Sequence, residues 1–146
     1  MSWKSLEDQR PELAAFGAAR LHGNVAYLAT LRKNGAPRVH PVTPIIGAGR
    51  LFVFMEPTSP KGHDLRRDAR YALHCSVSDS SGASGEFHVA GQAQPIDSPE
   101  LRALAVELAS YAPADRYILF ELGIESAAAT SYTADQIVRQ HWKNEA

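Results

Sequence analysis

Between Val25 and Leu31 the sequence takes a period of two, and the dipeptide Asn34-Gly35 follows shortly after. A period of two is typical of a strand with one buried face, and Asn-Gly is a strong signal for a tight hairpin turn. Arg38–Ile46 is therefore expected to return as the partner strand. Because Pro41 and Pro44 have no amide hydrogen to donate, this strand should lie at a sheet edge or contain a bulge.

The rest of the chain alternates further strands with short helices. The expected strands are Leu51–Met55, Tyr71–Ser78, Glu86–Ile96, Arg116–Leu122, Ala127–Thr133 and Ile137–Trp142. The expected helices are Leu6–Leu21, capped by Ser5 and divided at Pro11, one that begins after Ser59, and one that begins after Ser98. Antiparallel strands with few helices predict a mainly β fold of the Greek-key type, a β-barrel with helical caps.

Composition narrows the class of protein. The 146 residues contain no repeat and no linker, which predicts a single domain over residues 1–146. The net charge of −1 offers no basic surplus for a nucleic acid or an anionic membrane, so neither partner is expected. Cys75 is the only cysteine, which excludes an internal disulfide and a cysteine-based metal site. Without a long apolar run, the protein is expected to be soluble and cytoplasmic.

The segment Ser59-Pro60-Lys61-Gly62 has the form of a helix start, with Ser59 as N-cap and Pro60 as first helical residue. A helix start leaves amides unpaired and carries partial positive charge, which attracts anions. Lys61 adds a full charge, whereas Pro60 removes one donor. The segment thus predicts either a phosphate site or a capped surface helix with a solvated lysine.

Arg38 and His40 share one face of their strand, and Thr43 lies on the other face unless Pro41 introduces a bulge. If this strand runs beside the helix that begins after Ser59, Arg38 or Thr43 could reach the same anion. The alternative is a surface Arg38 that pairs with a nearby carboxylate. Taken alone, the strand does not decide between the two.

Four segments follow one another in a recognisable order: Arg38–Thr43, Leu51–Met55, Ser59–Leu65 and Asp68–Leu73. This order resembles the pyridoxamine 5'-phosphate oxidase-like family of FMN-binding split barrels. That family shows a strand beginning with Arg, an apolar strand, a Ser-Arg-Lys helix start and an Asn-Pro-Arg-Val entry to the next strand. The resemblance, clearest over residues 24–96, implies an FMN-dependent oxidoreductase with a small-molecule substrate. It also implies a homodimer with the site at the subunit interface.

The resemblance also implies which residues bind the cofactor, while it assigns no catalytic residue. One strand would line the ring and ribityl chain, with the residues Arg38, Val39, His40, Pro41, Val42 and Thr43. Phe54 and Met55 would flank the cofactor. Lys61, preceded by Ser59, matches the family's phosphate-binding lysine, and Glu86 stands where a flavin-contacting Gln is common.

Two departures from the family pattern leave alternatives open. Pro60 replaces a phosphate-binding Arg, and Glu86 places a carboxylate where its charge would disfavour an anionic reduced flavin. The alternatives are a deazaflavin-dependent reductase and a non-catalytic protein that binds flavin or haem. No metal site is expected, because the histidines His40, His63, His74 and His88 lie on different elements without a ligand spacing.

Overall fold

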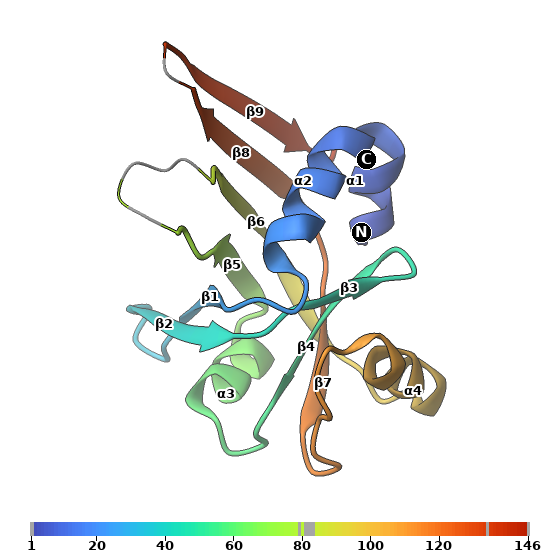
Figure 1. The fold of residues 1–146 in the computed structure, drawn as a ribbon. Helices are drawn as coiled ribbons and strands as arrows, with labels where there is room; N and C mark the ends of the chain where they lie inside the picture. Colours follow the sequence, from blue (N-terminus) through green and yellow to red (C-terminus); the bar gives the residue numbers. More distant parts are fainter. Residues whose placement is uncertain (1, 79, 81–83, 134, 146) are drawn as a thin grey trace.

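The computed structural model describes residues 2–78, 80, 84–133 and 135–145 (Figure 1). The helices are α1 (Trp3–Gln9), α2 (Pro11–Leu21), α3 (Pro60–Arg67) and α4 (Pro99–Leu108). The strands are β1 (Ala26–Leu31), β2 (Pro37–Val42), β3 (Ile45–Gly47), β4 (Arg50–Met55), β5 (Arg70–Cys75), β6 (Glu86–Pro95), β7 (Ile118–Leu122), β8 (Ser126–Tyr132) and β9 (Ile137–Lys143).

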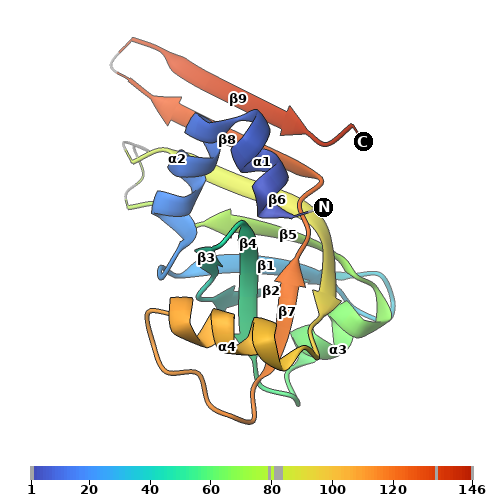
Figure 2. The ribbon, with the colours of Figure 1, turned by 90° about the vertical axis from the view of Figure 1, so that its right-hand side faces the viewer.

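The strands pair antiparallel and form one strongly curled sheet. The neighbours run β2-β1-β5-β6-β7-β4-β3, and β8 pairs with β6 and carries β9. Figure 2 shows α1 and α2 beside the β8-β9 end of the molecule, while α3 and α4 lie at the other end. The expected mainly β, antiparallel split-barrel class is confirmed.

Strand β6 changes partners near Gly91, and this is where the sheet curls. Residues up to Gln92 pair with β5 or β8, and Ala93–Pro95 pair with β7. A Cβ atom at Gly91 would lie 2.0 Å from the carbonyl oxygen of Gly123, so only glycine lets the two backbones approach this closely. The hydroxyl of Tyr71 donates to the same carbonyl at 2.8 Å.

Two clusters of buried side chains fill the interior. The larger unites the helical residues Trp3, Leu6, Leu13 and Leu21 with the strand residues Leu28, Leu73, Phe87, Val89 and Phe120. The smaller lies beneath α4 and contains Ile45, Phe52, Phe54, Ala105 and Leu119. Alternate residues of β1, β5 and β6 point into the larger cluster, which leaves the other face of these strands outside the core.

Most local predictions are confirmed, and two are corrected. The hairpin pairs Leu31 with Pro37, and Gly35 adopts a φ of 86° in the turn. The N-terminal helix begins at Trp3 with Ser2 at its N-cap, so the predicted Ser5 cap was wrong. The expected return strand 38–46 is two strands, because the chain leaves the sheet between Val42 and Ile45.

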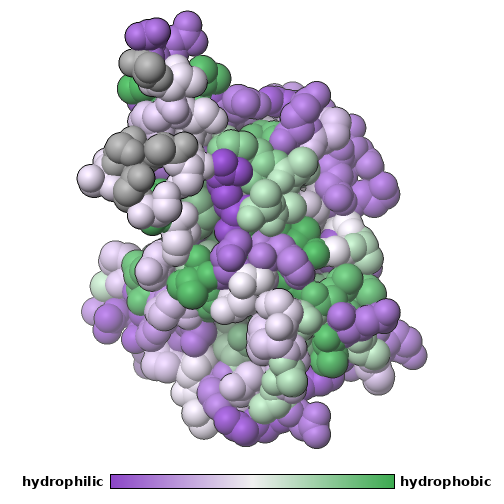
Figure 3. All heavy atoms as spheres, in the orientation of Figure 1, coloured by the Kyte–Doolittle hydropathy of each residue, from purple (hydrophilic) through white to green (hydrophobic). Residues whose placement is uncertain are grey.

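The surface in the orientation of Figure 1 mixes hydrophobic and hydrophilic side chains (Figure 3). Hydrophobic patches on this side are interrupted by hydrophilic ones. None of the helices in the described part of the chain is long and apolar enough to span a membrane.

Candidate functional site

Strand β2 directs alternate side chains to opposite sides of the sheet. Arg38 and His40 are partly buried on the side of α3, whereas Val39 and Pro41 are exposed on the other side. The register between β1 and β2 continues through Pro41, so the shared face predicted for Arg38 and His40 holds without a bulge. Thr43 follows the end of the strand, and it belongs to neither face.

A buried carboxylate, Asp64 of α3, holds this side of the sheet together. Its Oδ2 accepts from Arg38 Nε at 2.7 Å and from the Thr30 hydroxyl at 2.8 Å, and its Oδ1 accepts from Arg67 Nη2 at 2.8 Å. Burial raises the pKa of Asp64, but the hydrogen bonds from Arg67, Thr30 and Arg38 outweigh it, so the pKa lies below its ordinary value. Arg38 therefore pairs with a carboxylate through its Nε, which is one of the two alternatives that the sequence left open.

Ser59 and Lys61 occupy the first turn of α3. The Ser59 hydroxyl accepts from the Gly62 amide at 3.3 Å, which confirms the predicted N-cap, and Pro60 stands at the first helical position. Gly62 is closely packed, since a Cβ atom there would lie 3.2 Å from Met55 Sδ. The Gly62 amide is thus used by the cap, and the side chain of Lys61 carries the free charge of this turn.

Lys61 lies close enough to His40 for its charge to lower the pKa of the imidazole. Partial burial lowers the pKa of Lys61, and the carboxylate of Glu56 opposes this shift. Partial burial also lowers the pKa of His40, and the positive charges of Lys61 and Arg38 lower it further. In the described residues no carboxylate lies within ion-pairing distance of Lys61, since Glu56 binds Arg116 instead, with Oε2 3.0 Å from Arg116 Nε.

We call the group Arg38, His40 and Lys61, with Asp64 beneath it, the cation corner. It combines a guanidinium, an imidazole and an ammonium from two elements far apart in the sequence. These are the groups that bind phosphate monoesters in proteins, with arginine and lysine supplying charge-assisted hydrogen bonds. The residues present therefore fit a phosphate-bearing ligand.

The remaining predicted cofactor residues do not all join the cation corner. Phe54 and Met55 are buried in the core, and Arg102 stacks over the Phe54 ring at 5.2 Å. Glu86 stands on β6, three strands away from β2, where its Oε2 accepts from the Tyr132 hydroxyl at 3.1 Å. Val42 is buried within the larger core cluster.

A second group lies on the opposite side of the same sheet. The pairing places Tyr27 beside His74 and His74 beside His88, and it places Val39, Ala29 and Ala72 in the neighbouring row. These six residues line a cavity of about 330 Å³ together with Leu73. We call them the histidine face. The rings of His74 and His88 are stacked, with centroids 5.8 Å apart and planes inclined by 11°.

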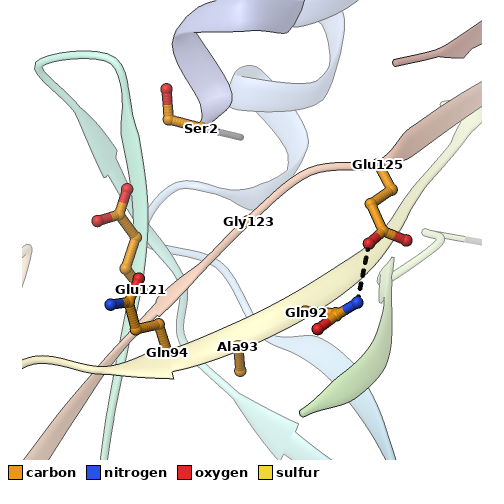
Figure 4. A pocket seen from close by; sticks show the side chains of 7 residues that line it. All are labelled: Ser2, Gln92, Ala93, Gln94, Glu121, Gly123 and Glu125. Carbon is orange, nitrogen blue, oxygen red and sulfur yellow. Dashed lines mark hydrogen bonds between the residues drawn. The ribbon is translucent and has the colours of Figure 1, made fainter. Parts of the chain in front are cut away.

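A third hollow, of about 480 Å³, lies over the crossing of β6 and β7 (Figure 4). Gln94 and Glu121 lie on one side of it, and Gln92 donates to Glu125 at 3.2 Å on the other. Arg50 pairs with Glu121, which leaves Glu125 without a cation among the described ion pairs. An acidic hollow of this kind repels a phosphate, so it does not compete with the cation corner for such a ligand.

The family model for pyridoxamine 5'-phosphate oxidase matches residues 12–133. The chain belongs to this family. Pyridoxamine 5'-phosphate oxidase-like proteins commonly bind flavin and are typically dimeric. No curated protein matches the chain.

Solved structures similar to this pyridoxamine 5'-phosphate oxidase-like chain share its fold. A haem-binding protein from Mycobacterium smegmatis has a TM-score of 0.68 and 21% identity, covering 86% of this chain, which spans 55% of the length of that protein. A putative 5-nitroimidazole antibiotic resistance protein from Bacteroides thetaiotaomicron has a TM-score of 0.66 and 11% identity. The match covers 84% of this chain and 83% of that protein. A haem storage protein from Vibrio cholerae has a TM-score of 0.60 and 17% identity. The match covers 80% of this chain and 89% of that protein.

Sequence reasoning missed Asp64 and the pairing of His74 with His88. Asp64 was visible only as one residue of the Ser59–Leu65 segment, and nothing local indicated that it is buried. His74 and His88 stand on separate strands, and only the register of β5 with β6 brings them together. In the part of the chain that the structure describes, no three His, Cys, Asp or Glu side chains are grouped as metal ligands.

Proposed function

We propose that this chain binds FMN and acts as an FMN-dependent oxidoreductase on a small-molecule substrate. The observation that carries the proposal is Lys61, a partly buried ammonium without a carboxylate partner in the described residues, beside His40 and Arg38. An anion that approached Lys61 would offset the cost of its burial. The membership of a family that commonly binds flavin supports FMN as that anion.

Each residue of the cation corner has a part in this proposal. Lys61 binds the phosphate directly, and the outer nitrogens of Arg38 bind it while Nε stays on Asp64. His40 accepts a proton when the phosphate arrives, and Ser59 fixes the start of α3. FMN, when bound, supplies the hydride-transfer chemistry, and the chain orients it.

The ring would lie along the edge strand β2, whose unpaired edge offers backbone groups on the side of the cation corner. Phe54, Met55 and Val42 would support this region from the core, and Thr43 lies just beyond the end of β2. Glu86 lies three strands away and has no part in this site of the same chain. In a homodimer, a second copy would complete the site over this edge strand. The free buried Cys75 agrees with a reducing, cytoplasmic location.

Titration of the purified protein with FMN and with riboflavin tests the proposal. We expect FMN to bind at least about tenfold tighter than riboflavin, because only FMN carries the phosphate. The loaded protein should then oxidise a reduced nicotinamide. Equal affinity for both flavins would reject the cation corner as a phosphate site, and preference for a deazaflavin coenzyme in the same assay would replace FMN by that cofactor.

A second candidate function is haem binding, with or without turnover. Two solved structures of the same fold are a haem-binding protein and a haem storage protein. The histidine face supports the idea, because it places two imidazoles in an apolar cavity. A Soret band after titration with haemin would support this candidate, and its absence would reject it.

A further inference from the structure

We infer that Arg32 and Arg67 bind a second phosphate, the 2'-phosphate of a reduced nicotinamide dinucleotide (NADPH), which is the electron donor of the proposed reaction. The inference rests on the proposed FMN-dependent function, because that function needs a donor of hydride. We call Arg32 and Arg67 the arginine pair. They lie at the end of α3 that is opposite to Lys61.

The β1-β2 hairpin places Arg32 on the side of the sheet that α3 covers. Alternate residues of a strand share a face, and Arg32 follows two positions after the buried Thr30. The Arg32 amide donates to the Ala36 carbonyl at 2.8 Å, so the pairing of the hairpin continues through this residue. The Thr30 hydroxyl binds Asp64 of α3, which identifies the face. Accordingly, the charge of Arg32 contributes to the lowered pKa of His40 on the neighbouring strand.

Arg67 brings its guanidinium to the same place from the last turn of α3, which lies alongside the hairpin (Figure 1). Its Nη2 donates to the Leu31 carbonyl at 2.7 Å and to Asp64 Oδ1 at 2.8 Å. The Leu31 carbonyl belongs to the peptide bond that joins Leu31 to Arg32, so the guanidinium of Arg67 lies against the backbone of Arg32. Nε and Nη1 of Arg67 have no hydrogen-bond partner among the described residues, which leaves these two donors for a ligand.

The carboxylates near the arginine pair do not balance its charge. Asp64 is buried and already accepts three hydrogen bonds. The side chain of Arg32 forms no ion pair or hydrogen bond within the part of the chain that the structure describes. Asp68, the next carboxylate along the chain, is bound by Arg70 at 2.7 Å. Because neighbouring like charges repel one another, an anion that binds between them is stabilised.

The arginine pair is too far from Lys61 to share its phosphate. Lys61 stands in the first turn of α3 and Arg67 is the last residue of the helix, which separates their backbones by about 9 Å along the axis. The carboxylate that acts on the pKa of Lys61 is Glu56, which precedes the helix, whereas Arg67 lies against the hairpin. FMN has one phosphate, and Lys61 binds it in the proposed function. The arginine pair is therefore available for the phosphate of a second ligand.

The chemistry of the arginine pair favours NADPH over NADH. The two donors differ only at the 2' position of the adenosine ribose, which carries a phosphate in NADPH and a hydroxyl in NADH. Sites for NADH hold this ribose with a carboxylate, whereas an arginine accommodates the 2'-phosphate. Asp64 and Asp68, the described carboxylates beside the pair, are both engaged, so the phosphate is the group that finds partners here. Hydride leaves C4 of the dihydronicotinamide, which is oxidised, and its two electrons reduce the flavin; the 2'-phosphate only positions the donor.

Anaerobic reduction of the FMN-loaded full chain by NADPH and by NADH tests the inference, followed by the loss of flavin absorbance. We expect the apparent Kd of wild type to be at least about tenfold lower for NADPH than for NADH, because only NADPH offers a phosphate to the pair. Arg32→Ala should bring the ratio of the two Kd values close to one. Two matched controls should keep the ratio of wild type: Lys33→Ala in the same turn, and Arg66→Ala on the same helix, where Arg66 lines a different hollow.

A calorimetric titration without flavin separates this inference from the proposed function. We expect 2',5'-ADP to bind at least about tenfold tighter than 5'-AMP, which lacks only the 2'-phosphate, and Arg32→Ala to remove this difference. Equal binding of the two nucleotides, or a preference that Arg32→Ala keeps, would overturn the inference and leave the FMN function standing. If FMN does not bind and the preference still depends on Arg32, the FMN function fails and the arginine pair stands as a phosphate site. Circular dichroism of Arg32→Ala should match that of wild type, since the Arg32 side chain is exposed.

Discussion

The cation corner and the histidine face lie on opposite sides of one sheet, and they differ in how their side chains are held. Asp64 ties the cation corner to the core through three hydrogen bonds, and it is 2% exposed. On the histidine face one hydrogen bond orients His74, and the surrounding side chains are open to solvent. Changes in the cation corner should therefore affect stability as well as binding, whereas changes on the histidine face should affect binding alone.

The largest expected effect is at Asp64. Asp64→Ala leaves Arg38, Arg67 and Thr30 without their shared acceptor. Thr30 is buried while both arginines reach solvent, so the loss should be about 2 kcal/mol. We expect urea denaturation to show this loss in the free energy of unfolding. Asp64→Asn should lose less, because the amide oxygen still accepts. A loss below about 1 kcal/mol for the alanine variant would contradict the buried network.

Acid should remove the contribution of Asp64 in wild type. Its pKa is lowered in the folded protein, so it stabilises the fold above the ordinary carboxyl pKa of about 4, and this contribution disappears as the pH falls through the lower folded value. The difference in unfolding free energy between wild type and Asp64→Asn should be constant from pH 7 to about pH 5. It should shrink below about pH 4, and a constant difference down to pH 2 would disagree with the lowered pKa.

A smaller effect is expected at His40. Partial burial and the neighbouring cations lower its pKa, so it is neutral at pH 7, and a bound phosphate would raise the pKa. FMN affinity of wild type relative to His40→Asn should therefore increase as the pH falls from 7.5 to 5.5, by about threefold to tenfold. The phosphate of FMN also titrates in this pH range, but it does so with both proteins, so the ratio of their affinities reports on His40 alone. Parallel pH profiles would show that His40 does not face the phosphate.

The smallest effect should be on the stability of histidine-face variants. His74→Ala and His88→Ala remove partly exposed side chains, so each should change the unfolding free energy by no more than about 0.5 kcal/mol. Thermal or urea denaturation checks this. A loss comparable with that of Asp64→Ala would mean that the stacked pair supports the fold, and the contrast between the two regions would not hold.

Local signals in the sequence predicted the elements well. The hairpin at Asn34-Gly35 and the caps at Ser59 and Ser98 were predicted, because a turn or a cap depends on residues within four positions. The break between β2 and β3 was less clear, since prolines at Pro41 and Pro44 are compatible with an edge strand as well as with a chain that leaves the sheet.

Contacts between distant segments were not predictable in the same way. Arg38 and Asp64 are 26 residues apart, so the carboxylate partner that the sequence allowed for Arg38 could not be named. His74 and His88 meet because of the register between β5 and β6, and the loop that joins these strands contains no signal that fixes it. The order of segments indicated Lys61 and Arg38 as cofactor residues, and their role remains a prediction.

The most direct test of the central claim is the FMN affinity of Lys61→Ala, measured beside the matched control Lys33→Ala, an exposed lysine in the β1-β2 turn. We expect Lys61→Ala to bind FMN about tenfold to a hundredfold more weakly than wild type, with riboflavin affinity unchanged, because a charge-assisted contact to phosphate is lost. Lys33→Ala should bind like wild type. If Lys61→Ala keeps the FMN affinity of wild type, the cation corner is not a phosphate site.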